Sequence, residues 1–254
     1  MTAEIRVSAL WRHPIKAVGA ERCARTVLMA GETMPGDRVW AVAHAASRHD
    51  PAAPDWTHCS AFCRGAAAPA LMAVDAAFDA EAGAVTLRHP ERPEIVVRPD
   101  RPAEAARLVK WLAPLYPDDR PAPARVAKAP GRGMTDSPFP SISLAGGSSL
   151  TALGQKAGQT LDMRRFRINI WLEGTGPWQE FEWPGREAML GTARIRFVER
   201  IERCRATHGN PETGRADIDM LSVLEDGWSH RNFGVYAEVI AGGEVAEDDR
   251  LLLL

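Results

Sequence analysis

Short runs of β-forming residues, separated by turn signals rich in proline and glycine, recur along this chain of 254 residues. Such runs lie at residues 4–11, 23–29, 38–43, 84–87, 94–97, 167–172, 193–198, 234–240 and 250–254. Residues 84–87 and 94–97 flank a His-Pro-Glu-Arg-Pro turn and read as a hairpin. Many short strands at short spacing, with few helices, favour an α+β fold that is rich in β-structure and built from barrels.

Two stretches carry helical signals instead. Apolar residues recur at helical spacing over residues 102–115. A second helix is expected over residues 148–154, where Ser148 can cap the start and Gly154 can end the helix. Residues 121–133 are rich in proline, glycine and basic residues, as a linker would be. We therefore expect a β-barrel-like domain over residues 1–100, a helix and linker over 101–135, and a second β-rich domain over 136–254.

Charge and cysteine content limit the classes of partner. Lysine and arginine number 31 against 33 acidic residues, a net charge of -2, which gives no overall attraction to nucleic acid or an anionic membrane. Four cysteines are too few and too scattered for a disulfide scaffold. The sequence shows no signal peptide and no apolar stretch long enough for a membrane span. A cytoplasmic protein without nucleic-acid or membrane partners is the expectation.

Cys204 stands in the segment ERCRATHGNPETG, residues 202–214. Neighbouring positive charge favours the thiolate, which is the nucleophilic and metal-binding form of cysteine. Arg203 and Arg205 flank Cys204, but in a strand both side chains would face away from the thiol. The local sequence leaves two interpretations open: a buried, inert thiol and a thiolate that serves as ligand or nucleophile.

A second cluster contains His58, Cys59 and Cys63. Two cysteines four positions apart beside a histidine could bind zinc, with His49 or Asp50 completing a tetrahedral site. No second paired set of cysteine and histidine occurs in the sequence, however. The alternative is an apolar turn that packs Cys63 into a core.

Several cations are candidates for an anion site. Arg167 and Asn169 share one face of the strand predicted over 167–172, and such a pair can bind a phosphate or a pterin. A solvated sheet edge fits the same pattern. Lys16 and Arg38 are single cations beside turn signals. The sequence has no phosphate-loop, dinucleotide-binding or Gly-x-Ser-x-Gly motif, so nothing points to those enzyme classes.

Six motifs in a fixed order resemble those of a known family. They are HPIKAVGAE (13–21), GDRVW (36–40), SPF (137–139), MRRFRINI (163–170), ERCRATHGNPETG (202–214) and FGVYAEVIAGGEVAEDDRLLL (233–253). In this order they resemble MOSC-domain proteins with an associated N-terminal β-barrel domain, the group of the mitochondrial amidoxime-reducing components and their bacterial relatives. The resemblance implies an N-terminal β-barrel-like domain and a C-terminal MOSC β-barrel with a few helices.

The resemblance also implies a molybdenum cofactor, whose pterin carries a phosphate and a dithiolene. Cys204 matches the cysteine that supplies a thiolate to molybdenum. The other positions that match cofactor contacts come from both halves of the chain: Lys16, Arg38, Ser137, Arg167 and Asn169. Ala17 stands where the family often has serine, and His208 lies where the cysteine loop departs from the family pattern.

The activity implied is the removal of oxygen from small N-hydroxylated substrates. Cys204, His208 and Asp136 are the implied catalytic residues, the last two as proton relays near the motifs. No ferredoxin-like cysteine set, and hence no intrinsic iron–sulfur cluster, is expected, so electrons would come from a separate ferredoxin, flavoprotein or b-type cytochrome. The alternative is a sulfur carrier with a persulfide on Cys204, or a protein that binds the cofactor for transfer.

Overall fold

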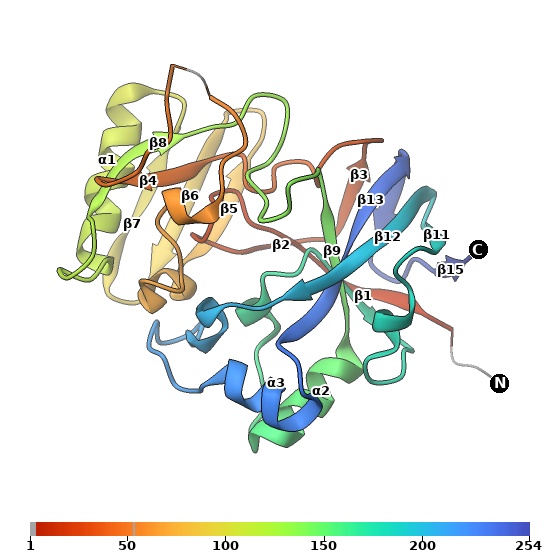
Figure 1. Cartoon of the computed structure of the whole chain (residues 1–254). Coiled ribbons are helices and arrows are strands. Elements are labelled where there is room, and N and C mark those ends of the chain that lie inside the picture. Colours follow the sequence, from red (N-terminus) through yellow and green to blue (C-terminus); the bar gives the residue numbers. More distant parts are fainter. Residues whose placement is uncertain (1–3, 53) are drawn as a thin grey trace.

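The computed structural model describes residues 4–52 and 54–254 and is dominated by β-strands (Figure 1). The largest sheet has eight strands in the order β15–β11–β12–β13–β9–β10–β1–β2. Their bounds are β1 (Arg6–Arg12), β2 (Glu21–Cys23), β9 (Ile142–Gly146), β10 (Ile170–Glu173), β11 (Glu187–Leu190), β12 (Ala193–Glu202), β13 (Asn232–Ala241) and β15 (Leu251–Leu253). β9 and β10 pair in parallel, whereas the other neighbours are antiparallel. The sheet therefore joins the start of the chain to its C-terminal half.

Three smaller sheets complete the β-structure of the described residues. One pairs β3 (Arg25–Leu28) with β14 (Gly243–Ala246), and another pairs β4 (Ala41–His44) with β8 (Pro123–Ala127). The third contains β5 (Asp75–Asp79), β6 (Ala84–His89) and β7 (Arg92–Val97). β6 and β7 are the hairpin predicted around the His-Pro-Glu-Arg-Pro turn, and that prediction is confirmed.

The β-rich α+β class is confirmed, whereas the closed barrels that were expected are not formed by the sheets of the described residues. No sheet within residues 4–52 and 54–254 closes on itself, and the eight-stranded sheet ends at β15 and β2. The start of β15 and the residue before it approach β1 through the Arg6–Arg250 bridge and through the Leu251 amide, which donates to the Ile5 carbonyl at 2.9 Å. Farther along β1, residues 10–12 pair with β2 instead.

Two of the helices were predicted. α1 (Pro102–Leu112) continues into a 3-10 turn up to Leu115, which agrees with the expected span. α2 (Gly147–Ala157) is longer than predicted at both ends. Ser148 does not cap it, since its hydroxyl pairs with that of Thr175 at 2.9 Å. Gly154 does not end it either: the left-handed Gly158 does, at φ 70°.

α3 (Met220–Trp228) was not predicted. The Asp219 carboxylate caps its start by accepting from the Ser222 amide at 3.1 Å. Met220 and Leu224, four residues apart, face the core together. α2 and α3 lie side by side at one end of the large sheet (Figure 1).

Apolar side chains gather in separate clusters on the two sides of the molecule. The large sheet buries one cluster that includes Leu10, Phe197 and Val239. A second cluster, around Trp40 and Trp111, joins α1 to the sheets of the N-terminal half. The first half of β12 contributes Ile195 and Phe197 to the first cluster, and Ile201 near its end belongs to a third cluster with Leu224 of α3. Among the helices described, none is long and apolar enough to cross a membrane.

Candidate functional site

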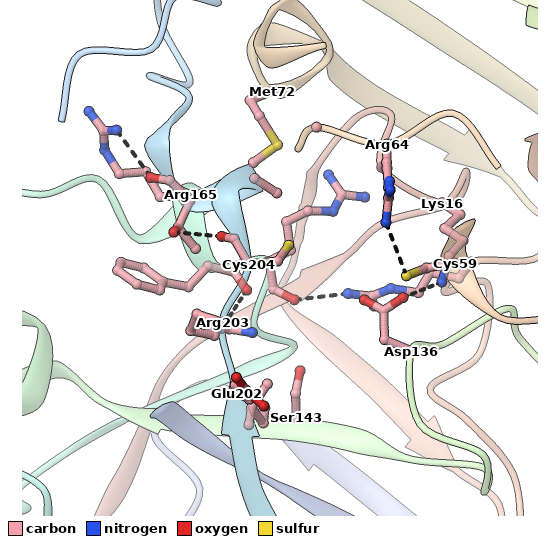
Figure 2. Close-up of a pocket in the computed structure, with 18 of the residues that line it drawn as sticks. Lys16, Cys59, Arg64, Met72, Asp136, Ser143, Arg165, Glu202, Arg203 and Cys204 are labelled. Atoms are coloured by element: carbon pink, nitrogen blue, oxygen red, sulfur yellow. Dashed lines mark hydrogen bonds and ion pairs between the residues drawn. The ribbon is translucent and has the colours of Figure 1, made fainter. Parts of the chain in front are cut away.

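A cavity of about 210 Å³ lies where the N-terminal and C-terminal halves of the chain meet. Its N-terminal wall comes from residues 16–17, Arg38 and the segment 59–72. Its C-terminal wall comes from residues 165–167, 201–204 and 206–207, together with the single residues Asp136, Ser143 and Tyr236. Figure 2 shows that these side chains, far apart in the sequence, point toward one shared space.

Cys204 lines this cavity and its side chain is exposed, so the interpretation as a buried, inert thiol is wrong. β12 ends at Glu202, and Cys204 opens a 3-10 turn over Arg205–His208. The Thr207 hydroxyl donates to the Cys204 carbonyl at 3.0 Å and fixes this turn. Because the chain leaves the strand here, strand alternation does not apply, and Arg203 lines the same cavity as the thiol.

Lys16 and Asp136 form an ion pair across the two walls. The Lys16 ammonium is buried and donates to Asp136 Oδ1 at 2.5 Å and to the Met134 carbonyl at 2.6 Å. Burial disfavours the charged form of Asp136, but Lys16 and then Arg38 outweigh it and lower the pKa of the carboxyl. Asp136 is therefore a carboxylate at neutral pH, and the pair ties residues 120 positions apart.

Arg38 is held by a buried polar network. Its guanidinium pairs with Asp37 and donates to the Arg167 carbonyl at 3.1 Å. Asp37 also accepts from the His13 backbone amide at 2.8 Å and lies 3.1 Å from His13 Nδ1. Burial, followed by repulsion from Arg167, lowers the pKa of His13 to about 3, so this imidazole is neutral. The network holds Arg38 at the cavity.

Arg167 and Arg203 bring two further guanidinium groups to the cavity. Arg167 donates to the carbonyls of Gly19 at 3.0 Å and Ile15 at 3.3 Å, and so crosses to the N-terminal half. Burial and the nearby Arg38 lower the pKa of Arg167 to about 9. Burial also lowers the pKa of Arg203, whose Nε has no hydrogen-bond partner among the described residues. Crowded cations of this kind favour a bound anion.

Backbone conformation at the cavity is unusual. Ala17, Arg38 and Arg167 have φ of 61°, 51° and 49°, in the left-handed region that non-glycine residues rarely adopt. They are three of the six non-glycine residues with positive φ in the described part of the chain. Each such residue carries strain of about 1–2 kcal/mol, and such strain gathers at functional sites.

The prediction that Arg167 lies in a strand is wrong, because β10 begins only at Ile170.

Two predicted contact residues lie outside the cavity. Asn169 Oδ1 accepts from the Ser143 amide at 3.1 Å and from its hydroxyl at 2.9 Å, while Asn169 Nδ2 donates to the Trp11 carbonyl at 3.2 Å. Ser143 does line the cavity, so Asn169 supports its wall. Ser137 is buried, and its hydroxyl donates to the Phe139 carbonyl at 2.7 Å.

His208 lies in a different place from the other predicted residues. It borders a separate surface hollow of about 310 Å³, where Nε2 lies 3.3 Å from the Asp219 carboxylate. Burial lowers the pKa of His208, with Asp219 opposing the shift. The structure therefore does not bring His208 together with Cys204, Lys16, Arg38, Asp136 and Arg167, which all line the main cavity.

Several cavity residues had no predicted role at this site, among them Arg64, Met72 and Tyr236, and Cys59 was considered only as a zinc ligand. Tyr236 comes from β13, and burial followed by the Asp136 charge raises its pKa to about 12, so it stays a phenol. Its signal was its place in the C-terminal FGVYAE motif. Arg203 was considered, but strand alternation was assumed to turn it away from the thiol.

The zinc alternative finds no support in the geometry. Cys63 is buried in the second apolar cluster, whereas Cys59 lines the cavity. Over residues 4–52 and 54–254, no group of three or more histidine, cysteine, aspartate or glutamate side chains is arranged to hold a metal ion. Phe62 and Cys63 are both buried in apolar clusters, as expected for the apolar turn that was the alternative to a zinc site.

Comparison with known proteins gives the family. Residues 4–116 match the model of the MOSC N-terminal beta barrel domain, and residues 135–252 match that of the MOSC domain. A solved structure of the YUAD protein from Bacillus subtilis aligns over 98% of this chain and 94% of its own, with 11% identity and a TM-score of 0.48. YiiM from Geobacillus stearothermophilus aligns over 44% of this chain and 53% of its own, with 17% identity and a TM-score of 0.34. No curated protein matches. The two family matches show that the chain is a MOSC-domain protein that also carries the MOSC N-terminal domain.

Proposed function

We propose that the cavity binds a molybdenum cofactor and that the protein reduces small N-hydroxylated compounds. The observation that carries this proposal is the exposed thiol of Cys204 in a cavity lined by cations from both halves of the chain. A pterin with a phosphate and a dithiolene-bound molybdenum needs both features: positive charge for the phosphate and a soft ligand for the metal.

The residues present fit such a group. Arg203 has an Nε without a partner among the described residues, and the pKa of Arg167 is lowered beside Arg38, so an added anion would relieve repulsion between cations. In this proposal Lys16, Arg38, Arg167 and Arg203 hold the pterin phosphate. Asn169 acts through Ser143, and Ser137 through the loop that carries Asp136, as positioning residues.

Cys204 would supply the protein's thiolate to molybdenum, since soft thiolate sulfur suits such a metal. When bound, the cofactor supplies two-electron oxygen-transfer chemistry. For an amidoxime, two electrons and two protons are taken up, the N–O bond breaks, and an amidine and water are formed. The electrons would come from a separate partner such as a ferredoxin, flavoprotein or b-type cytochrome.

The protein's own groups would handle the protons. Tyr236, with its pKa raised to about 12, keeps its O–H and can donate a hydrogen bond to substrate oxygen at any physiological pH. Asp136 is charged at neutral pH and is placed to accept a proton beside Lys16. His208 lies outside the cavity, so its role as a relay requires a path past the Cys204 turn.

The test is metal content and turnover in protein made by a host that produces the cofactor. Wild-type protein should carry stoichiometric molybdenum and reduce benzamidoxime with a reduced viologen dye as donor. Cys204→Ser should abolish turnover, whereas Cys23→Ser, which removes a thiol that does not line the cavity, should leave it within about twofold. Full activity in the Cys204 variant would refute the ligand assignment.

The second candidate is a sulfur carrier, favoured by one observation: Cys59 lines the same cavity as Cys204. A second thiol could accept the outer sulfur of a Cys204 persulfide by attack on its S–S bond, leaving Cys204 as a thiol. A labile persulfide on Cys204 in molybdenum-free protein, without amidoxime reduction, would favour the carrier. Molybdenum with turnover favours the reductase.

A further inference from the structure

Arg64 differs from the other cations at the cavity in what it contacts. Lys16, Arg38 and Arg165 each pair with a carboxylate: Asp136, Asp37 and Asp217. Arg167 and Arg203 instead donate to backbone carbonyls. The side-chain contact found for Arg64 is with the Cys59 thiol, at 3.9 Å from Nη1, and no ion pair involving Arg64 occurs among the described residues.

Arg64 is also exposed and belongs to the N-terminal wall, the segment 59–72. Figure 2 shows Arg64 and Met72 on the side of the cavity away from Glu202 and Arg203. The cations assigned to the pterin phosphate lie on residues outside this segment. A guanidinium at this place is therefore available to a second ligand that enters beside Cys204.

Met72 gives the same wall an apolar surface in a fixed position. It is 5% exposed and lines the cavity. A Cβ at Gly65 would lie 2.7 Å from Met72 Sδ, and a Cβ at Gly209 would lie 2.8 Å from Met72 Cγ. Two glycines, one from each half of the chain, thus leave the space that Met72 fills. A hypothetical Cβ at Gly65 would also lie 3.3 Å from Ala206 Cβ, so the wall reaches the turn that carries the thiol.

We propose that the segment 59–72 is the substrate-recognition wall, in which Met72 contacts an apolar body and Arg64 binds an anionic group of the substrate. This inference rests on the proposed function and narrows its substrate class to N-hydroxylated compounds that carry a carboxylate or a similar anion. Planar pairing of a guanidinium with a carboxylate supplies the selectivity, since two parallel hydrogen bonds form at once.

The experiment compares benzamidoxime with its 4-carboxylate. Binding to molybdenum-loaded protein is measured by calorimetry without an electron donor, and turnover is measured separately with a reduced viologen. Wild-type protein should bind the carboxylate about tenfold more tightly than the neutral compound, the size expected of one charged hydrogen-bonded contact. Arg64→Gln should remove that preference while leaving affinity for benzamidoxime within about twofold.

Matched variants separate this role from others. Arg107→Gln makes the same charge change on an exposed face of α1 outside the cavity and should preserve the preference. Arg64→Lys should restore part of it, because the charge returns without the planar fork. Equal affinity of wild-type protein for the two compounds, or a loss of molybdenum in Arg64→Gln, would overturn the inference. Selective binding without turnover would leave it standing and refute the proposed reductase instead.

Discussion

Arg38 stands at the centre of the charge arrangement at the scale of residues. Its pairing with Asp37 holds the side chain at the cavity, and its charge adds to burial in lowering the pKa of both Arg167 and His13. His13 therefore remains neutral in the fold, beneath a cluster of cations. Such an arrangement makes stability depend on pH through groups that never touch the cavity.

Replacing His13 should change how stability varies with pH. The pKa of His13 is lowered from 6.5 to about 3, so between these pH values the unfolded chain binds a proton that the folded chain does not. This contribution is fully present above pH 6.5 and is lost progressively as pH falls toward 3. His13→Asn, which cannot titrate, should flatten the decline in free energy of unfolding between pH 7 and pH 4, as measured by urea denaturation.

The control is the same substitution at an exposed histidine, His58→Asn. Identical slopes for wild-type protein and His13→Asn would show that His13 is not a buried neutral imidazole.

At the scale of elements, the strand β13, which contains Tyr236, packs tightly against β9 at Gly234. Gly234 has φ 76°, and a Cβ there would lie 2.7 Å from the Leu144 carbonyl oxygen and 3.0 Å from Ile168 Cδ1. β13 pairs with β9 at this point, so the backbone cannot move away without breaking the ladder. Glycine is required here by both conformation and space.

Gly234→Ala should therefore destabilise the protein by about 3 kcal/mol, from left-handed strain together with overpacking. Gly83 is the matched control: its φ is 60°, but nothing lies within 4 Å of an added Cβ, so a substitution there adds backbone strain without overpacking. Gly83→Ala should cost only about 1 kcal/mol. Chemical denaturation of both variants measures the difference, and equal effects would contradict the steric contribution.

Sequence patterns predicted the elements better than the contacts between them. The hairpin of β6 and β7 and the helix α1 followed from local spacing and turn residues. Arg167 was misplaced because its left-handed backbone arises from contacts with Ile15 and Gly19 in the other half of the chain, which local propensity cannot reveal. Arg64 was missed because only the tertiary fold brings segment 59–72 to the thiol.

In the candidate site, too, some residues could be predicted from the sequence and others could not. The cysteine, Lys16 and Arg38 followed from motifs that resemble those of the family, and the structure brings them to one cavity. His208 was chosen for closeness in sequence, but the 3-10 turn after Cys204 carries it toward Asp219. Closeness in sequence does not show on which side of a short turn a side chain lies.

At the scale of the whole molecule, the large sheet depends on both ends of the chain. β1 pairs with β10, and Val7 and Leu10 of β1 are fully buried in the core of the sheet. Burial of two such side chains contributes about 3–6 kcal/mol, a large share of the 5–15 kcal/mol that stabilises a typical protein. Without β1, β10 would also become an unpaired edge strand.

The fragment 135–254 should therefore fail to unfold cooperatively on its own, although it spans the matched MOSC domain. Co-expression with residues 1–128 should restore a soluble complex, because that piece contains β1 and the N-terminal cavity wall. Thermal denaturation followed by circular dichroism measures both. A cooperative transition of the fragment alone, close to that of the full chain, would contradict the shared sheet.

The cavity and the sheet together place Cys204 between two halves that are held by the Lys16–Asp136 pair and by Arg167. If this thiol is a ligand of molybdenum, X-ray absorption at the molybdenum edge should detect it. Spectra are recorded on wild-type protein and Cys204→Ser from the same host. We expect one more sulfur ligand in the wild-type spectrum than in the variant. Bound molybdenum with the same sulfur count in both proteins would contradict it.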